Sequence, residues 1–500
     1  MGNDRGRWWT ALLPSVLAGG AGVALALALP GAGIAPLVVL FPALLLEAVA
    51  RASSARGAAF AGWAGGTIHW VVATNWVVPV MHHYGGLPLP LAVLCLAGMA
   101  AILGTTWAFA AGLAHRASPG LRPLALASAW AVTEALREGP LFRFPWNPVA
   151  AVLASRPEAL GSLPVWGALG LGWAVVAASG GAWAMLRRPT RRAGAATAGG
   201  AAAALAIATL AAPHPVPAGS SVRVALLQPG TTLEERWTPG GAGALLGRVA
   251  AMTREAAAGG ASLVLWPESA ATGSVERDPS LDRWIGNLAR ETGATILLES
   301  IGWDARGRPT NAAHVVTPAG RRPERYDKVR LVPFGEYVPW WARWGFTRGL
   351  VREVGSFVPG REARPLPTPA GPVGVAICYE IVFPGLVARE VRHGAVLMAT
   401  LTNDGWYGYS WAPRQHMAQA VLRAVETRRW VLRAALTGIS AAIDPRGRVV
   451  ARLDVGRQGV LVVDAAPSRV LTPFVRFTGW WTWVVLLLLV GTLLPGAARR

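Results

Sequence analysis

The chain has 500 residues, of which 53% are hydrophobic and 15% are charged. Soluble globular proteins carry about 25% charged residues, so this composition excludes a disordered or wholly soluble protein. The formal net charge is nonetheless +20, and Lys328 is the single lysine among the 47 basic residues. In a chain that otherwise uses arginine, this lysine is a candidate for a specific chemical role.

Long apolar stretches dominate the first 212 residues. A membrane-spanning helix needs about 20 mostly apolar residues. Such runs lie at 8–30, 31–46, 57–80, 87–114, 121–136, 163–186, 193–212 and 477–498. They predict a polytopic α-helical membrane domain of about eight spans, with seven helices in 1–212 and the eighth at 477–498. The first run also fits a signal peptide, but its apolar character continues past Pro30, which favours an uncleaved anchor.

The placement of arginines predicts the orientation of these spans. With the N-terminus inside, most arginines of the short loops are cytoplasmic, and the opposite loops hold only Arg137, Arg143 and Arg156. Seven spans then place residues 221–465 outside the cytoplasm.

The two cysteines are too few for a disulfide scaffold. Cys95 lies in the fourth predicted span and cannot reach Cys378. We therefore expect a free thiol at Cys378 in an oxidising compartment, where free thiols are usually avoided unless they do chemistry.

The segment 221–465 has frequent charges and alternating elements. Helices are predicted at 241–258, at 281–291, after Pro384 and at 412–427. Strands are predicted at 222–228, 262–266, 294–301, 311–317, 373–377, 395–401, 430–436, 438–443, 448–453 and 458–463. This alternation predicts a layered α/β domain.

Three polar residues lie at or just after the ends of predicted strands: Glu268, Lys328 and Cys378. Such strand ends carry the reactive groups of α/β folds. A carboxylate can take the proton of a thiol, and an ammonium can stabilise the oxyanion of a tetrahedral intermediate, so the three suit acyl transfer. Separately, each has a simpler interpretation: a small buried hydrophobe for Cys378, a helix N-terminal acid for Glu268, and part of a solvated charged face for Lys328.

Three sequence blocks contain these residues: Leu-Trp-Pro-Glu-Ser at 265–269, Tyr-Asp-Lys-Val-Arg-Leu-Val-Pro-Phe-Gly-Glu-Tyr-Val-Pro at 326–339, and Ile-Cys-Tyr-Glu at 377–380. In order and spacing they resemble the signature blocks of the nitrilase, or carbon–nitrogen hydrolase, superfamily. With the flanking spans, the whole chain resembles the membrane-embedded apolipoprotein N-acyltransferase family. The resemblance implies an extracytoplasmic α-β-β-α sandwich over 221–465, inserted between spans seven and eight.

The resemblance also implies the roles of individual residues. Glu268 would be the general base, Lys328 the oxyanion stabiliser and Cys378 the nucleophile. The supporting residues would be Glu336, which orients the lysine, Tyr379 and Glu380 beside the nucleophile, Trp237 on a loop over the site, and Asn403 and Trp406 near it.

The family's activity is the final step of bacterial lipoprotein maturation. The resemblance implies that an acyl chain passes from a phospholipid, through a cysteine thioester, to the N-terminal amine of a diacylglyceryl-cysteine apolipoprotein. It implies a multi-pass protein of the bacterial inner membrane, with its catalytic domain on the periplasmic side and membrane lipids around it. No cofactor or metal is expected. Nucleic-acid binding is not expected either, since arginines at span ends account for the positive charge.

Two other functions remain open at this stage. A membrane-tethered amidase or hydrolase would use the same three residues with water as the acceptor, and a transporter or scaffold would carry a catalytically dead insert.

An aromatic loop at 339–346 suggests an interfacial surface. The polar residues His69, Asn75 and Glu134 within or near the spans receive no role, although Glu134 is spaced to pair with Arg137.

Overall fold

The protein is described here from a computed structural model that covers residues 4–338 and 357–494, without the side chains of residues 4–11 and Trp237. The aromatic loop predicted at 339–346 lies outside the described residues. The chain divides into two compact units. One contains the segment up to His82, Leu87–Ala212 and the segment from Phe477 on, and the other contains His83–Gly86 and Pro213–Arg476.

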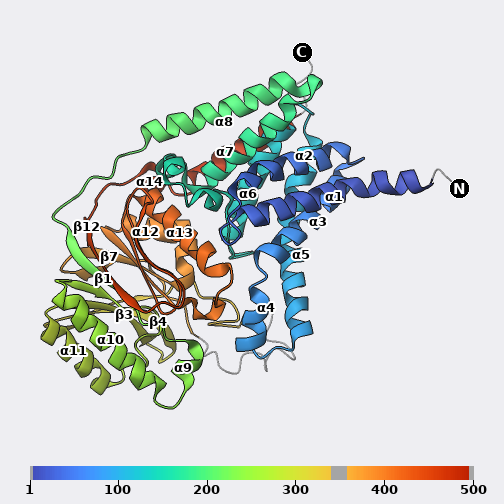
Figure 1. Ribbon diagram of the computed structural model, residues 1–500. Helices are drawn as coiled ribbons and strands as arrows, with labels where there is room; N and C mark the ends of the chain where they lie inside the picture. The colour runs from blue at the N-terminus through green and yellow to red at the C-terminus, as the bar shows by residue number, and fades with distance from the viewer. Residues whose placement is uncertain (1–3, 339–356, 495–500) are drawn as a thin grey trace. The chain divides into compact units, whose positions relative to one another are not determined.

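The first unit is helical (Figure 1). Its main helices are α1 (Asp4–Ala28), α2 (Leu40–Arg51), α3 (Ala55–Ala73), α5 (Leu89–Arg116), α6 (Arg122–Glu138), α7 (Leu163–Met185), α8 (Arg191–Ala211) and α15 (Trp480–Leu493), with a short α4 (Val77–Pro79). They correspond in order to the eight predicted runs. Within the described residues, three helices are long and apolar enough to cross a membrane, at Leu89–Arg116, Leu163–Met185 and Arg188–Ala211. The count of eight spans stays a prediction.

Small residues let the helices of this unit approach closely. A Cβ on Gly65 of α3 would lie 2.3 Å from the carbonyl oxygen of Ala18 in α1, and a Cβ on Gly62 would lie 2.7 Å from that of Trp107 in α5. Close backbone approach at glycine is typical of helix packing in membranes. On α6, Glu134 and Arg137 form the expected ion pair, with 3.5 Å between Oε1 and Nη2.

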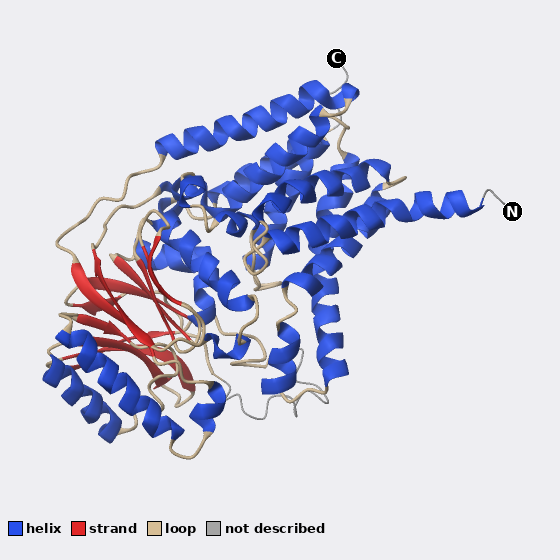
Figure 2. Cartoon of the chain, in the orientation of Figure 1, coloured by secondary structure: helices blue, strands red, loops and turns tan. Residues whose placement is uncertain are grey.

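The second unit contains two six-stranded sheets (Figure 2). The order of the first is β12-β1-β2-β3-β4-β5 and that of the second is β11-β10-β9-β8-β7-β6. The first sheet consists of β1 (Val222–Gln228), β2 (Leu263–Leu265), β3 (Thr295–Trp303), β4 (Pro309–Thr317), β5 (Gly320–Asp327) and β12 (Gly459–Ala465). The second consists of β6 (Leu366–Thr368), β7 (Gly371–Ile377), β8 (Leu397–Thr402), β9 (Val431–Ala435), β10 (Ser440–Ile443) and β11 (Val449–Leu453).

The period of two in the strands explains the layers of this unit. On β1, Val224 and Leu226 point into a core shared with Val375 and Ile377 of β7, whereas Ala225 and Leu227 point into a second core. That second core includes residues of α10 (Gly241–Ala258) and α11 (Pro279–Thr292). Helices α12 (Pro384–Arg392) and α13 (Ala412–Thr427) pack against the second sheet. The predicted α-β-β-α sandwich is therefore confirmed.

Most predicted elements of this unit begin and end within a few residues of the observed ones. The sequence analysis missed β5 and the short β6. Strand β5 reads Gly-Arg-Arg-Pro-Glu-Arg-Tyr-Asp and lies at the edge of its sheet, where charged residues and a proline are tolerated and the alternation of apolar residues is lost.

Candidate active site

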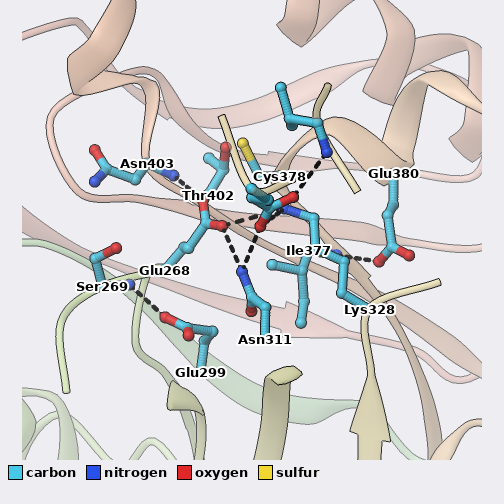
Figure 3. A network of polar contacts seen from close by, with 12 residues as sticks. Glu268, Ser269, Glu299, Asn311, Lys328, Ile377, Cys378, Glu380, Thr402 and Asn403 are labelled. Atoms are coloured by element: carbon cyan, nitrogen blue, oxygen red, sulfur yellow. Dashed lines mark hydrogen bonds and ion pairs between the residues drawn. The ribbon is translucent and has the colours of Figure 1, made fainter. Parts of the chain in front are cut away.

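The two sheets bring together the three residues singled out in the sequence (Figure 3). Glu268 follows β2 and Lys328 follows β5, both in the first sheet, whereas Cys378 follows β7 of the second. Their relative exposures are 8%, 1% and 6%. The site therefore lies between the sheets, where little water reaches the reacting groups.

The ammonium of Lys328 lies between two carboxylates. Its Nζ donates to Oε1 of Glu336 at 2.9 Å and to Oε1 of Glu268 at 3.4 Å. Burial alone would lower the pKa of Lys328, but Glu336 and Glu268 raise it well above its usual range, so the lysine stays charged. An ammonium has three N–H donors. Among the described residues, Lys328 uses two of them on Glu336 and Glu268, which leaves the third for a substrate oxygen.

Glu268 is held in place by main-chain and side-chain donors. Its Oε2 accepts the backbone N–H of Asn403 at 2.9 Å, and its Oε1 also accepts Nδ2 of Asn311 at 3.2 Å. The same Asn311 amide donates to Oε1 of Glu336 at 2.9 Å. Asn311 thus joins both carboxylates that flank Lys328.

Cys378 is a free thiol at a sharp change of chain direction. Its φ of 51° lies in the left-handed region, which costs a residue other than glycine roughly 1–2 kcal/mol. Such local strain is typical of functional sites, where the surrounding structure imposes it. Burial and the charge of Glu268 raise the pKa of Cys378 far above its ordinary value, so the resting group is a thiol that needs a base.

The carboxylate of Glu380 connects the two sides of the site. Its Oε1 accepts the backbone N–H groups of Val329 at 2.7 Å and Arg330 at 3.0 Å, next to Lys328. Its Oε2 accepts the N–H of Ile377 at 2.9 Å, next to Cys378. The hydroxyl of Tyr326 also donates to this carboxylate at 2.9 Å. Glu380 therefore fixes the lysine segment relative to the cysteine segment, although burial raises its pKa to about 7.

A second buried acid lies behind Glu268. Oε2 of Glu299, on β3, accepts the backbone N–H of Ser269 at 2.6 Å. Ser269 has a φ of 66°, so this contact supports a strained residue directly after Glu268. Burial and the neighbouring charge of Glu268 raise the pKa of Glu299 to about 8, which keeps it protonated at neutral pH.

The other residues expected near the site fall into two groups. Glu336 and Glu380 contact the segment of Lys328 as described, and Asn403 contributes its backbone N–H to Glu268. Tyr379 is buried, and its ring packs edge-on against Phe383 with 5.2 Å between centroids. Trp406 and Trp237 form the second group. Trp406 is 37% exposed. Trp237 is the last residue of the short helix α9 (Leu233–Trp237), and its side chain is not among those that the structure describes.

Several polar residues of the site were missed by the sequence analysis. Asn311 and Glu299 were assigned to predicted strands, and Tyr326 stood in the block at 326–339 without a role of its own. Asp404 and His416 were assigned to the end of a strand and to a helix. The sequence did contain one signal for these residues: each is polar at a position where a buried strand or helix would normally have an apolar residue. Among the described residues, no group of three His, Cys, Asp or Glu side chains could hold a metal ion.

The arrangement supplies the parts of a covalent acyl-transfer site. It has a buried thiol, a carboxylate able to take its proton and a fixed positive charge beside both. The double carboxylate contact fixes the ammonium before substrate arrives, which is the condition for effective electrostatic stabilisation of an oxyanion.

The chain is similar to known proteins along nearly its whole length. Residues 223–471 match the carbon-nitrogen hydrolase family, and residues 21–181 match the apolipoprotein N-acyltransferase N-terminal domain. The chain is 32% identical to an apolipoprotein N-acyltransferase of Azotobacter vinelandii, over 97% of this chain and 96% of that protein. It is 31% identical to that of Geobacter metallireducens, over 88% and 87%. Among solved structures, an amidase from Nesterenkonia sp. is 22% identical with a TM-score of 0.39, covering 51% of this chain and 94% of the amidase.

Proposed function

The chain belongs to the apolipoprotein N-acyltransferase family, and we propose that it carries the acyl group on Cys378 between two substrates. As a member of this family it is an acyltransferase that acts on a lipoprotein with an acyl donor. The proposal concerns the chemistry: a phospholipid as donor, the N-terminal amine of a diacylglyceryl-cysteine as acceptor, and Glu268, Lys328 and Cys378 as catalytic residues.

In the first half-reaction, Glu268 takes the thiol proton as the sulfur of Cys378 attacks the ester carbonyl of the phospholipid. The resulting oxyanion lies within reach of the Lys328 ammonium. When the intermediate collapses, the ester C–O bond breaks, and the departing alkoxide takes the proton from Glu268. A lysophospholipid leaves, and the acyl chain remains as a thioester on Cys378.

In the second half-reaction, the neutral α-amine of the acceptor attacks the thioester carbonyl. Glu268 accepts a proton from the attacking nitrogen, and Lys328 again faces the oxyanion. The C–S bond breaks, and the sulfur recovers its proton from Glu268. The products are an amide on the lipoprotein and the free thiol, so the enzyme returns to its starting state.

The observation that carries this proposal is the position of Lys328 between Glu268 and Glu336. Two carboxylates keep the only lysine of the chain charged in a site where it is 1% exposed. Since the resting thiol is neutral, the site also needs the base that Glu268 provides. An uncompensated buried ammonium would be costly, so the arrangement stabilises the protein only as a complete set.

We further propose that the first unit, which includes α15, embeds the protein in the bacterial inner membrane through about eight spans. The three long apolar helices and the distribution of arginines support this proposal. In this arrangement the catalytic unit faces the periplasm. Both proposed substrates are lipids or lipid-modified, so an enzyme anchored in the bilayer meets them where they reside.

A labelling experiment tests the nucleophile. The purified chain is incubated with a phospholipid radiolabelled in its acyl chain, and hydroxylamine-sensitive label on the protein is measured. We expect label on the parent and on Cys95→Ala, which removes the other cysteine, and none on Cys378→Ala. Cys378→Ser should acquire at most a slowly formed ester, because a hydroxyl is harder to deprotonate than a thiol.

The acceptor is tested in the same preparation by adding a diacylglyceryl peptide. Loss of protein label should coincide with acylation of the peptide. Label on Cys378→Ala would exclude Cys378 as the nucleophile. Release of free fatty acid without peptide acylation would instead support a hydrolase that uses water.

A further inference from the structure

A cluster of four fully buried polar residues contacts the nucleophile but takes no part in the mechanism above. Thr402 ends β8, Asp404 begins a short helical turn after it, His416 lies on α13 and Arg433 on β9. Each is at most 1% exposed. We call these residues the Asp404 cluster. Burying so many polar groups is costly unless they are mutually satisfied or serve the site.

Cys378 contacts the cluster through its own carbonyl oxygen. Nε2 of His416 lies 3.1 Å from this oxygen. A carbonyl can only accept, so Nε2 must carry a hydrogen. This contact restrains the backbone of Cys378, the residue whose φ is positive.

The remaining contacts of the imidazole are compatible with a hydrogen on Nε2. Nδ1 of His416 lies 2.9 Å from Oδ1 of Asp404 and 3.1 Å from Nη2 of Arg433. In a neutral ring Nδ1 accepts from Arg433, and in a charged ring it donates to Asp404. Both forms leave Nε2 as the donor to Cys378, so the restraint does not depend on the charge of the ring.

Asp404 also holds Thr402, which lies beside the thiol (Figure 3). The Thr402 hydroxyl donates to Oδ1 of Asp404 at 3.0 Å, and the Thr402 side chain lies next to the side chain of Cys378, where it partly offsets the rise in the thiol pKa. One hydroxyl has one hydrogen. In the resting state that hydrogen is donated to Asp404. When Cys378 loses its proton, the hydroxyl can instead turn and donate to the neighbouring thiolate sulfur.

The charge of Asp404 remains stabilised when the Thr402 hydroxyl turns away, because other groups provide that stabilisation. Nη2 of Arg433 donates to Oδ2 of Asp404 at 2.5 Å. Burial would raise the pKa of Asp404, but Arg433 and His416 hold it well below its usual range. The carboxylate therefore stays ionised whichever way the Thr402 hydroxyl points.

On the basis of the proposed function, we infer that the Asp404 cluster prepares Cys378 for attack. His416 and Asp404 are positioning residues that fix the backbone of the nucleophile, and the Thr402 hydroxyl is a direct partner of the reacting sulfur that stabilises its thiolate. A purely structural ion pair between Asp404 and Arg433 would also explain the burial, but it requires neither the contact of His416 with the Cys378 carbonyl nor the position of Thr402 beside the thiol.

The chain offers matched controls for both contacts. Thr400 lies on the same face of β8, two residues before Thr402, and Gln419 lies on α13, one turn after His416. Both are buried, and the side-chain polar atoms of both have no hydrogen-bond partner among the described residues. Thr400→Val and Gln419→Leu therefore remove buried polar atoms that form no hydrogen bond with Cys378 in the described part of the chain.

The first measurement is the rate at which iodoacetamide alkylates Cys378 at pH 8, followed by peptide mass spectrometry so that Cys95 is counted separately. Thr402→Val should react about tenfold more slowly than the parent, the factor that one pKa unit makes in the thiolate fraction. Thr402→Ser and Thr400→Val should react at the parental rate. Equal rates for Thr402→Val and the parent would overturn the role of the hydroxyl.

The second measurement is the rate of acyl transfer at saturating phospholipid. His416→Leu should lower kcat by roughly 10- to 100-fold, the scale expected for a misplaced reacting group, with KM nearly unchanged. His416→Gln, whose amide can donate to the Cys378 carbonyl, should recover most of the rate, and Gln419→Leu should retain it. Equal losses in His416→Leu and His416→Gln, in step with their melting temperatures, would show a structural role only.

These results are separable from a failure of the proposed function. Alkylation of Cys378 reports on the thiol itself and does not require acyl transfer. If Cys378→Ala still became acylated, the proposed nucleophile would be wrong, whereas the alkylation rates would still decide whether Thr402 acts on this thiol.

Discussion

Glu299 gives a prediction about stability whose sign follows from its surroundings. Its pKa is raised to about 8 from 4.5 by burial and by the charge of Glu268. Between these two pH values the folded protein holds a proton that the unfolded chain has released. Stability therefore falls as pH rises across this window. Glu299→Gln cannot titrate, and its side-chain oxygen can still accept the N–H of Ser269.

The size of the effect follows from the linkage relation. One proton contributes about 1.4 kcal/mol per pH unit, so between pH 5.5 and 7.5 the parent should lose about 3 kcal/mol relative to Glu299→Gln. In a domain of this size each kcal/mol shifts the melting temperature by roughly 2–4 °C. We therefore expect the variant's advantage in melting temperature to widen by about 5–10 °C over this range.

The assay is thermal unfolding of the full chain in detergent at a series of pH values, followed by circular dichroism. Glu255→Gln, which alters an exposed carboxyl on α10, serves as the control and should follow the parent at every pH. Parallel curves for Glu299→Gln and the parent would refute the reasoning, because they would show that Glu299 loses its proton at an ordinary pH in the folded protein.

Three further predictions concern the site and the topology. Lys328→Arg should lower turnover at least roughly 100-fold in the transfer assay, because a planar guanidinium cannot occupy the ammonium position between Glu268 and Glu336; near-parental turnover would make the lysine an ordinary charge. Asn311→Leu should lower stability by about 1–3 kcal/mol in denaturant unfolding, since it leaves both carboxylates short of one donor; an unchanged midpoint would show that water replaces the amide. An alkaline phosphatase fusion near residue 300 should be active and one near 190 inactive, and the reverse would overturn the proposed orientation.

The sequence predicted the layered fold because β1 and β7 are short apolar strands and α10 and α11 have clear amphipathic patterns. It also predicted which polar residues lie at strand ends. It did not predict how they contact one another. Asn311 joins Glu268 to Glu336 only because β4 runs beside β5, and that pairing involves a charged edge strand without a readable pattern. Long-range pairing of this kind has no local signal.

The Asp404 cluster was missed for a related reason. His416 lies in the middle of a helix in which nearly every residue is buried, so its face could not be assigned from periodicity. Its contact with the Cys378 carbonyl joins residues 38 positions apart. Glu299 was hidden within a buried strand in the same way. In each case the missing information was the packing of one sheet or helix on another.

The bridge formed by Glu380 has a consequence for how the protein matures. The base and the lysine belong to one sheet, the thiol belongs to the other, and Glu380 ties their segments together through backbone N–H groups of both. A chain in which only one sheet has formed therefore has either a cysteine without its activating partners or those partners without a cysteine. On the proposed mechanism, acylation requires that the two sheets have docked, so an incompletely folded molecule cannot acylate itself or its neighbours.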